Sequence, residues 1–394
     1  MPTLKTLNDI GDIKGKRVIV RATLNVPAKD GVVLDNTRIV RFAPTAKLLA
    51  DKGAKVIILT HFGRPEGVDP EFSVGFMVPE LSKAIGKVVG FAADCVGEVA
   101  KETVAKMDDG NVLLLENTRF HKEETANDPA FAKELASLGD IFVNDAFADA
   151  HRAHASTEGI TKFLPSYAGL LMEEEVNALA KALDNPARPS TAIVAGAKIS
   201  TKISVLENIA QKVDNMLIGG AMANTFLMAE GFPVGKSLVE ADMLDIARKV
   251  KATSKAKIVL PVDVVVAKEI KDGAAARTVA PDAVAADDII LDIGAKSIEL
   301  FNSVIDESKT VLFNGTVGLS EMKPFDIGSA SIIRHIMKQT GAGKLASIAG
   351  GGDTVAAINA FGDESEFTYV STAGGAFLEY LEGKTLPALP PLYA

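Results

Sequence analysis

Cationic side chains follow four expected strands in the first half of the chain, at the point where each strand ends. These strands are the apolar runs 17–24, 55–60, 111–116 and 140–145. The polar and cationic residues at or beyond their ends are Arg21, Asn25, His61, Arg64, Arg119, His151, Arg152 and His154. The carboxyl ends of parallel strands meet at one edge of a sheet, and converging positive charge is costly without a counterion. The pattern therefore predicts a site for a small anion, with scattered surface salt bridges as the alternative.

A glycine-rich turn marks a second candidate site in the other half of the chain. The three glycines 350–352 follow an apolar run and precede Asp353, Thr354 and an expected helix. Glycine lets backbone N–H groups approach a phosphate, and the start of a helix adds a favourable dipole. Asp353 could hold Mg²⁺ and Thr354 could donate to a phosphate, although either could simply cap the helix. Gly374 and Gly375 open another helix in the same way.

Two lysines, Lys198 and Lys202, begin a helix that is expected after the apolar run 191–196. Their spacing places both on one helix face, where their charge opposes the helix dipole. A bound anion would offset that cost, and two solvated lysines are the equal alternative. Together with the glycine turns, these residues predict a nucleotide site with a Mg²⁺ ligand. The two halves thus indicate a phosphotransferase that binds two substrates.

Short apolar runs alternate with helical stretches along the whole chain. Most runs are continuous, which is typical of parallel strands that are covered on both faces. The pattern predicts an α/β protein with two doubly wound, Rossmann-like parallel-sheet domains joined by a hinge. The other expected strands are 88–92, 191–196, 215–220, 257–266, 310–315, 345–350 and 367–372, and the expected helices include 128–139, 173–183 and 203–214. The expected domains are 1–172 with a tail from about 378 to 394, and 186–377, joined by the helical hinge 173–185 near Pro186.

Composition narrows the class of protein further. The chain has 394 residues, which favours two or three domains, and a net charge of −9, which argues against nucleic acid or an anionic membrane as a partner. A single cysteine, Cys95, excludes an internal disulfide framework. No run resembles a signal peptide or a membrane span, so we expect a cytoplasmic protein. Eight of the eleven arginines and four of the five histidines lie in residues 1–188, which fits an anion site there.

The chain resembles the phosphoglycerate kinase family over essentially its whole length. The matching strings, in the family's order, are NVP (25–27), HFGRP (61–65), ENTRF (116–120), DAFADAHRAHAS (145–156), GAKISTKI (196–203), GGAMANTFL (219–227), LPVDVVVA (260–267), LDIG (291–294), NGTVG (314–318), GGGDT (350–354) and STAGGA (371–376). The resemblance implies reversible phosphoryl transfer from 1,3-bisphosphoglycerate to Mg-ADP in glycolysis, giving 3-phosphoglycerate and Mg-ATP. It also implies a monomer that binds the glycerate on its N-terminal domain and the nucleotide on its C-terminal domain. A related kinase for another small hydroxy acid and a binding protein without transfer are the alternatives.

The resemblance also assigns roles to residues at matching positions. The glycerate would be bound by Arg21, Thr23, Asn25, Arg38, His61, Phe62, Gly63, Arg64, Arg119, His151 and Arg152, with His154 extending the basic patch. The nucleotide would be bound by Lys198, Lys202, Gly294, Asn314, Glu321, Gly351, Gly352, Asp353 and Thr354, with Mg²⁺ on Asp353. In-line transfer would be stabilised by Arg38, Lys198 and the backbone amides of Gly352, Gly374 and Gly375. Because Arg38 and Lys198 belong to different domains, this set is complete only when the domains close.

Four residues depart from the family's pattern. Thr23 stands where the family has an Asp that helps to hold the glycerate hydroxyl, so we expect weaker glycerate binding and a lower KM in a Thr23→Asp variant. Thr316 replaces a Pro, and Ser320 replaces an apolar aromatic residue. Ala373 replaces a Gly and would be strained by on the order of 1 kcal/mol if its position needs a positive φ. We still expect an active enzyme.

Overall fold

The computed structural model describes residues 3–394, which form two compact units. Unit 1 comprises the residues up to Val176 together with Thr385–Ala394, and unit 2 comprises Asn177–Lys384. The division falls inside helix α6 (Leu170–Leu179), within the segment 173–185 that the sequence suggested as the helical hinge. Among the described residues, no helix is long and apolar enough to cross a membrane.

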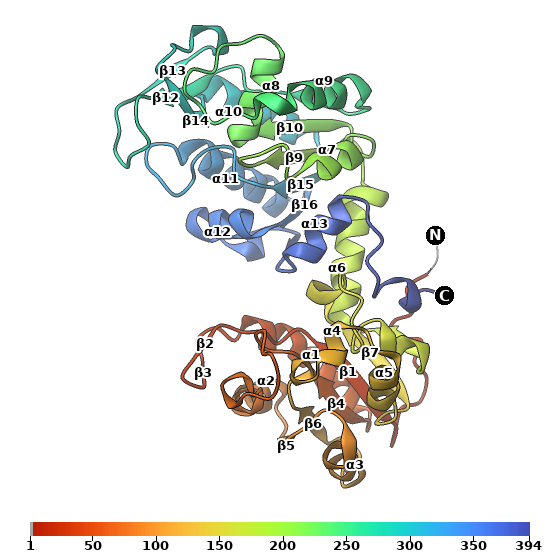
Figure 1. The fold of residues 1–394 in the computed structure, drawn as a ribbon. Coiled ribbons are helices and arrows are strands. Elements are labelled where there is room, and N and C mark those ends of the chain that lie inside the picture. The colour runs from red at the N-terminus through yellow and green to blue at the C-terminus, as the bar shows by residue number, and fades with distance from the viewer. Residues whose placement is uncertain (1–2) are drawn as a thin grey trace. The chain divides into compact units, whose positions relative to one another are not determined.

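Unit 1 is built on a six-stranded sheet whose paired strands are all parallel, in the order β5-β6-β4-β1-β7-β8 (Figure 1). Its strands are β1 (Arg17–Ala22), β4 (Lys55–Leu59), β5 (Val89–Ala92), β6 (Val112–Leu115), β7 (Ile141–Asp145) and β8 (Ser166–Ala168). A separate ribbon pairs β2 (Ala28–Lys29) with β3 (Val32–Val33). The sequence did not indicate β2, β3 or β8, because each is too short to form an apolar run.

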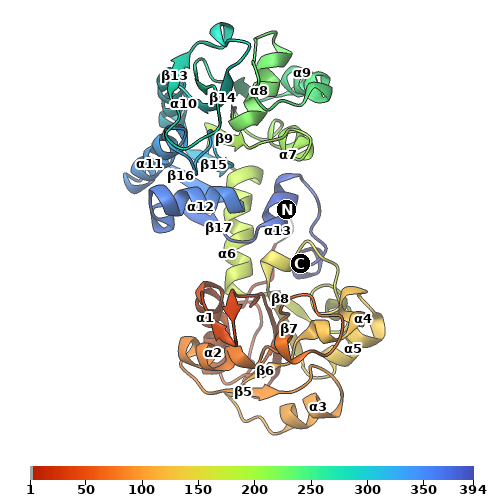
Figure 2. The ribbon, with the colours of Figure 1, turned by 60° about the vertical axis from the view of Figure 1, so that its left-hand side comes forward.

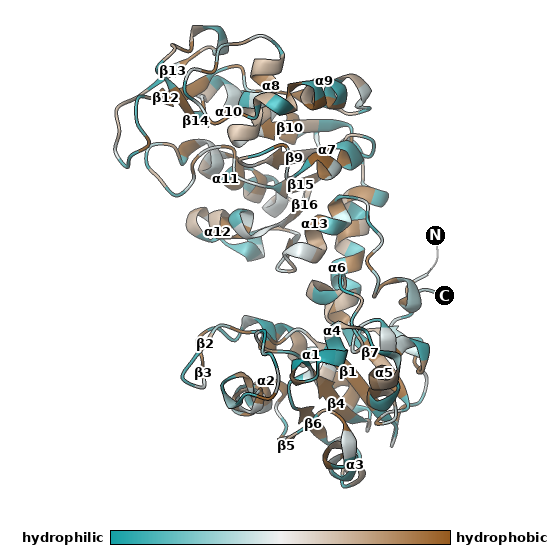
Figure 3. Ribbon diagram, in the orientation of Figure 1, coloured by the Kyte–Doolittle hydropathy of each residue, from teal (hydrophilic) through white to brown (hydrophobic). Residues whose placement is uncertain are grey.

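Helices cover both faces of this sheet. They are α1 (Thr37–Asp51), α2 (Val78–Ile85), α3 (Gly97–Ala105), α4 (Lys122–Thr125) and α5 (Pro129–Ala136). Successive side chains of a strand point to opposite faces, so Val18 and Val20 pack with α1 and α2, whereas Ile19 packs with α3 and α5. In Figure 2, α1 and α2 lie on one side of the sheet and α4 and α5 on the other. Two covered faces explain the continuous apolar runs, which colour the strands brown in Figure 3.

Unit 2 contains a second parallel sheet in the order β11-β10-β9-β15-β16-β17, and a small antiparallel sheet in the order β13-β12-β14. The parallel strands are β9 (Ser190–Ala195), β10 (Asn215–Gly219), β11 (Lys257–Val259), β15 (Thr310–Asn314), β16 (Ala346–Gly350) and β17 (Tyr369–Ser371). The antiparallel strands are β12 (Val264–Ala267), β13 (Ala276–Val279) and β14 (Ile289–Ile293). The helices after α6 are α7 (Ile203–Ile209), α8 (Gly220–Ala229), α9 (Leu244–Thr253), α10 (Ala295–Glu307), α11 (Ile327–Gly341), α12 (Gly352–Phe361) and α13 (Gly375–Leu381).

The α/β class with two parallel sheets is confirmed, whereas several local predictions are wrong. The helix expected over 203–214 ends at Ile209. The run 257–266 is not one strand, because Pro261, which has no N–H to donate, lies between β11 and β12 in different sheets. The helix expected over 128–139 ends at Ala136, although Asp128 caps it as expected and accepts from the Phe131 N–H at 2.9 Å.

The C-terminal tail packs within unit 1. The Lys5 N–H donates to the Leu392 carbonyl at 2.8 Å, and the Ala388 N–H donates to the Ala150 carbonyl at 3.2 Å. The second bond fastens the tail to the turn that follows β7, which is part of the candidate site described next.

Candidate active site

Four consecutive strands at the centre of the unit 1 sheet carry the cationic residues that the sequence singled out. Their order is β6-β4-β1-β7, so the segments that follow them are neighbours at one edge of the sheet. Arg119 follows β6, His61 and Arg64 follow β4, and Arg152 follows β7, whereas Arg21 lies within β1 near its end. The convergence that the strand ends suggested is therefore present in the fold.

Arg21 lies inside the protein, with only 1% of its surface exposed. Its Nε donates to Ser156 Oγ at 2.9 Å, and one terminal nitrogen donates to His61 Nδ1 at 2.8 Å. Burial, together with the charge of Arg21, lowers the pKa of His61 to about 3, so this imidazole is neutral and accepts that hydrogen bond. The guanidinium of Arg21 is thus engaged by the protein, and its influence on a ligand is indirect.

A buried carboxylate that the sequence did not single out, Asp149, lies beside Arg21. Its Oδ2 accepts from the Thr23 hydroxyl at 2.9 Å and from Arg21 at 3.3 Å, and its Oδ1 is 3.7 Å from an Arg152 nitrogen. Burial alone would raise the pKa of Asp149, but the charge of Arg21 holds it well below its usual range, and the hydrogen bond from Thr23 and the charge of Arg152 act in the same direction. Asp149 is therefore an ionised counter-charge behind the cationic residues.

Several expected cations line one hollow of about 480 Å³ in unit 1. The lining residues that the sequence predicted are Arg64, Arg119, Arg152 and His154. The other lining residues include His121, Lys122 and Thr125. Burial lowers the pKa of His154 to about 4, and Arg119 adds to this effect, so the histidine is neutral. The hollow thus joins permanently charged arginines with a neutral imidazole, a combination that suits a polyanion. His121 and Lys122 were not predicted from the sequence, although they directly follow the ENTRF string.

The remaining glycerate candidates do not line this hollow. These residues are Arg21, Thr23, Asn25, Arg38, His61, Phe62, Gly63 and His151. Most of them support the same loops: Asn25 Oδ1 accepts from the Gly63 N–H at 3.0 Å, and Arg38 donates to the Asn25 carbonyl at 2.9 Å. Gly63 has φ +62, and a Cβ there would lie 2.3 Å from the Phe72 ring. Its carbonyl accepts from Arg119 at 2.7 Å, so this glycine helps to place a cation of the hollow.

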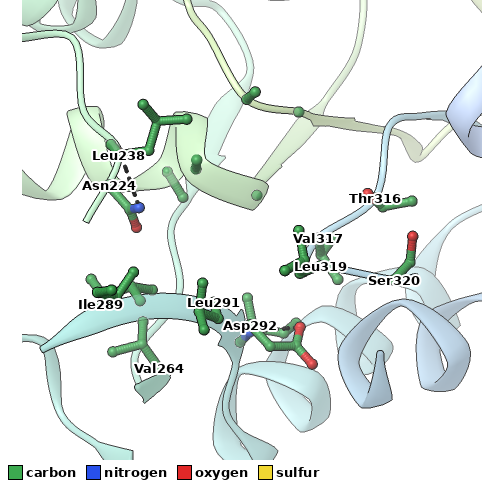
Figure 4. A pocket seen from close by; sticks show the side chains of 18 of the residues that line it. Asn224, Leu238, Val264, Ile289, Leu291, Asp292, Thr316, Val317, Leu319 and Ser320 are labelled. Carbon is green, nitrogen blue, oxygen red and sulfur yellow. Dashed lines mark hydrogen bonds between the residues drawn. The ribbon is translucent and has the colours of Figure 1, made fainter. Parts of the chain in front are cut away.

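Unit 2 contains a larger pocket of about 710 Å³. Figure 4 shows apolar side chains from β12, β14 and the neighbouring loops around it, among them Leu238, Val264 and Leu291. Asn224 also lines it and donates to the Leu238 carbonyl at 3.2 Å. An apolar cavity with a few polar groups fits an organic ring with a polar edge. The small antiparallel sheet that forms one wall was not foreseen from the sequence.

Some of the expected nucleotide residues line this pocket and others lie behind it. Glu321 and Asp353 line it, as do the departing residues Thr316 and Ser320. Gly294 does not line it, although the preceding residues Asp292 and Ile293 do. The other candidates outside the lining are Lys198, Lys202, Asn314, Gly351, Gly352, Thr354, Gly374 and Gly375.

Buried polar contacts tie together the strand ends behind the glycine turn. Lys202 Nζ donates to the Ala195 carbonyl and to Asn314 Oδ1, both at 2.7 Å. Asn314 Nδ2 donates to the Gly350 carbonyl at 2.8 Å, and Thr354 Oγ1 accepts from the Gly315 N–H at 2.7 Å. Burial lowers the pKa of Lys202 to about 8, although Asp353 opposes this shift. A lysine that titrates near neutral pH is an unusual feature for a solely structural contact.

The backbone at the glycine turns agrees with the expected phosphate contacts at some positions and corrects one expectation. Gly352 begins α12 and Gly374 has φ +57, and a Cβ at either would meet no atom within 4 Å. Among the described residues, only Asp30 and Asn127 combine a side chain with a positive φ. The strain expected at Ala373 is therefore absent.

Two groups of described residues could hold a metal ion. Asp353 is exposed at the start of α12, and a single carboxylate combined with nucleotide phosphates is a common way to hold Mg²⁺. Asp94, Cys95 and His121 also have their ligand atoms within 4.8 Å of one another. However, Asp94 Oδ1 already contacts His121 Nε2 at 2.8 Å, and burial raises the pKa of the Cys95 thiol well above its usual value. A protonated thiol is a poor ligand, so Asp353 is the better candidate.

The structure combines an apolar pocket near glycine-rich helix starts with a separate hollow lined by arginines. This combination is typical of a phosphotransferase with an α/β fold. A match to the phosphoglycerate kinase family covers residues 7–384. Proteins named phosphoglycerate kinase from Rhizobium leguminosarum bv. trifolii and Mesorhizobium japonicum are 54% and 55% identical to the chain, with 100% of each chain covered. A solved phosphoglycerate kinase structure from Coxiella burnetii is 40% identical, with a TM-score of 0.93 and 99% of each chain covered.

The chain therefore belongs to the phosphoglycerate kinase family. It is a transferase of glycolysis that moves a phosphoryl group reversibly between 1,3-bisphosphoglycerate and ADP. In the forward direction the substrates are 1,3-bisphosphoglycerate and ADP, and in the reverse direction they are 3-phosphoglycerate and ATP.

Proposed function

We propose that the hollow of unit 1 binds the glycerate substrate through Arg64, Arg119 and Arg152. The observation that carries this proposal is that three arginines from three different strand ends line a single hollow. Arginine pairs with carboxylate and phosphate through two parallel hydrogen bonds, and 3-phosphoglycerate carries both groups. Asn25, Arg38, His61, Phe62, Gly63 and His151 complete the site by holding the loops or by contacting the ligand directly.

The pocket of unit 2 binds the nucleotide in this proposal. Its apolar wall accepts the base, and Glu321 accepts from the ribose hydroxyls. The phosphates lie at the start of α12, where Lys202 supplies a positive charge and Thr354 and the backbone N–H groups of the glycine turn donate hydrogen bonds. Asn314 and Gly351 shape that turn, while Gly294 lies at the start of α10, directly after β14 of the pocket wall. Asp353 and the phosphates hold Mg²⁺, which neutralises phosphate charge when it is bound.

The transfer step needs groups from both units in this proposal. Arg38, Lys198 and the amides of Gly352, Gly374 and Gly375 stabilise the charge that spreads over the transferred group. Arg38 belongs to unit 1 and Lys198 to unit 2, so we also propose that the segment 173–185 acts as a hinge. The enzyme would be a cytoplasmic monomer, which light scattering tests by a single species of 41.4 kDa.

A coupled assay with 3-phosphoglycerate, ATP and Mg²⁺ tests the glycerate site. Arg119→Ala should raise the KM for 3-phosphoglycerate by roughly tenfold or more and leave the KM for ATP unchanged, because a charge-assisted hydrogen bond to the substrate is lost. The matched control is Arg17→Ala, which removes a surface arginine paired with Asp140 on the same sheet. An unchanged KM for 3-phosphoglycerate in Arg119→Ala would overturn the assignment.

The metal ligand is tested in the same assay by Asp353→Asn. This variant should need roughly tenfold more Mg²⁺ for half-maximal rate, because a carboxylate ligand is replaced by a neutral amide. Asp306→Asn is the control, since Asp306 is half-exposed and pairs with His335 elsewhere in unit 2. An identical Mg²⁺ dependence in Asp353→Asn and the natural protein would refute the role of Asp353.

A further inference from the structure

Thr23 and Asp149 form one hydrogen-bonded pair at the ends of adjacent strands. Thr23 follows β1, and Asp149 ends the short turn Phe147–Asp149 that follows β7. Oγ1 of Thr23 donates to Oδ2 of Asp149 at 2.9 Å, and Asp149 is only 4% exposed. Thr23 is partly exposed, so it lies between the buried carboxylate and the surface. In this pair, the Thr23 hydroxyl links the buried carboxylate of Asp149 to the surface.

The direction of this hydrogen bond decides what Thr23 offers to a ligand. A hydroxyl has one proton to donate and two acceptor lone pairs. Because the Thr23 proton is committed to an ionised partner, the exposed side of its oxygen is an acceptor, and the adjacent negative charge polarises it further. Such an oxygen suits a ligand that donates an O–H group.

The same carboxylate also positions cations of the site. Its second oxygen is 3.7 Å from Arg152, which lines the hollow, and Arg21 and His61 approach it from within the sheet. Removing Asp149 would leave Arg21 and Arg152 without their common counter-charge, and like charges that are no longer neutralised separate. Asp149 thus acts on a ligand through at least two neighbours, Thr23 and Arg152.

We propose that Asp149 is a substrate-positioning residue of the glycerate site, which fixes Thr23 as an acceptor for the glycerate hydroxyl and holds Arg152 at the hollow. The proposal rests on the assignment of that hollow to the glycerate. The pair Thr23–Asp149 then does in this chain what a single Asp at position 23 would do alone. The carboxylate that position 23 lacks is present instead on Asp149, which follows the neighbouring strand β7.

This proposal reverses the expected effect of a substitution at Thr23. An Asp at position 23 would place a second carboxylate within hydrogen-bond distance of Asp149. Two carboxylates in one buried site repel each other, and one of them takes up a proton or moves away. Thr23→Asp alone should therefore raise the KM for 3-phosphoglycerate instead of lowering it.

Three variants test the proposal through the two Michaelis constants. Asp149→Ala should raise the KM for 3-phosphoglycerate by roughly tenfold and change the KM for ATP by less than about twofold. Thr23→Asp should also raise the KM for 3-phosphoglycerate. The double variant Thr23→Asp/Asp149→Ala should return it to within about threefold of the natural value, because one carboxylate is again present. Asp140→Ala, which removes the partner of Arg17 at the opposite end of β1, is the control and should change neither constant.

The outcomes separate this proposal from the assignment on which it rests. If Arg119→Ala raises the KM for 3-phosphoglycerate but Asp149→Ala does not, Asp149 has no positioning role and the glycerate site stands. If neither variant changes it, the glycerate site itself is wrong. If Asp149→Ala unfolds and the double variant folds without regaining activity, or if both unfold, the role of Asp149 is structural and the proposal fails. A restored KM in the folded double variant supports it, since a purely structural role would not be rescued from position 23.

Discussion

We expect the lysine behind the glycine turn to make nucleotide binding dependent on pH, because its proposed contact with the phosphates needs its positive charge. Lys202 Nζ is held by the Ala195 carbonyl and by Asn314 Oδ1, and burial lowers its pKa to about 8. One pH unit below that value about ten lysines are charged for each neutral one, and one unit above it the ratio is reversed. If only the charged lysine attracts the phosphates, affinity for ATP should fall by roughly tenfold between about pH 7 and about pH 9.

The assay is the KM for ATP, together with direct titration of ATP binding, across this pH range at fixed free Mg²⁺. Lys202→Met should bind ATP weakly with little change in this range, because it has no group to titrate there. Lys202→Arg should also have a flat profile, because arginine stays charged. Lys212→Met is the control: it removes a half-exposed lysine that pairs with Asp184 in the same unit, and it should keep the natural profile.

The pH dependence of the stability of the ligand-free protein independently checks whether the pKa of Lys202 is lowered in the folded state. Between about pH 8 and about pH 10 the unfolded lysine holds a proton that the folded one has released, so the free energy of unfolding should rise with pH relative to Lys202→Met. The shift from 10.5 to about 8 corresponds to on the order of 3 kcal/mol over the whole window. A flat KM for ATP in the natural protein, or the same pH dependence in Lys202→Met, would refute the reasoning.

Three further predictions concern the loops and helix starts around the two sites. Gly63→Ala should lower the melting temperature and raise the KM for 3-phosphoglycerate, because its Cβ would lie 2.3 Å from the Phe72 ring; normal values for both would contradict the observed backbone. Thr354→Val should lower the free energy of unfolding by about 1–3 kcal/mol in urea denaturation, because the buried Gly315 N–H loses its acceptor. Burial raises the pKa of Asp145 to about 6, so its stabilising effect relative to Asp145→Asn should be present below about pH 4 and lost as the pH rises through 6, by on the order of 3 kcal/mol. A difference between these two proteins that stays constant from pH 4 to 7 in urea denaturation would exclude that titration.

The sequence was most informative where a pattern repeats and least informative where partners are distant. The continuous apolar runs predicted the parallel strands, and a cation after each of four strands predicted one anion site. The order β6-β4-β1-β7 brings those ends together, but no local pattern encodes the order of strands. The apolar content of 257–266 predicts one strand and hides the break at Pro261, and no strand was predicted where β14 lies, so the small antiparallel sheet did not emerge from the sequence.

Residues that act from behind a site were the hardest to foresee. Thr23 was interpreted by itself as a lost charge, because its partner Asp149 lies 126 positions away in the chain. Arg21 was expected to face the ligand, since a strand end is usually exposed, yet Ser156 and His61 bury it. In each case the deciding fact is a tertiary contact between segments that share no local pattern.

Two buried acids, Glu124 and Asp149, lie close to the arginines of unit 1, although most acidic side chains of this unit are exposed or only partly buried. Glu124 is fully buried and accepts from Ser156, which in turn accepts from Arg21, while Asp149 balances Arg21 and Arg152. Asp149 thus forms ion pairs with Arg21 and Arg152, and Glu124 fixes the serine that accepts from Arg21. Asp149→Ala makes the chain less negative, so long-range attraction alone would strengthen the binding of 3-phosphoglycerate. Positioning by the buried acid requires the opposite, a weaker complex, and the direction of the change in KM therefore decides which effect governs the site.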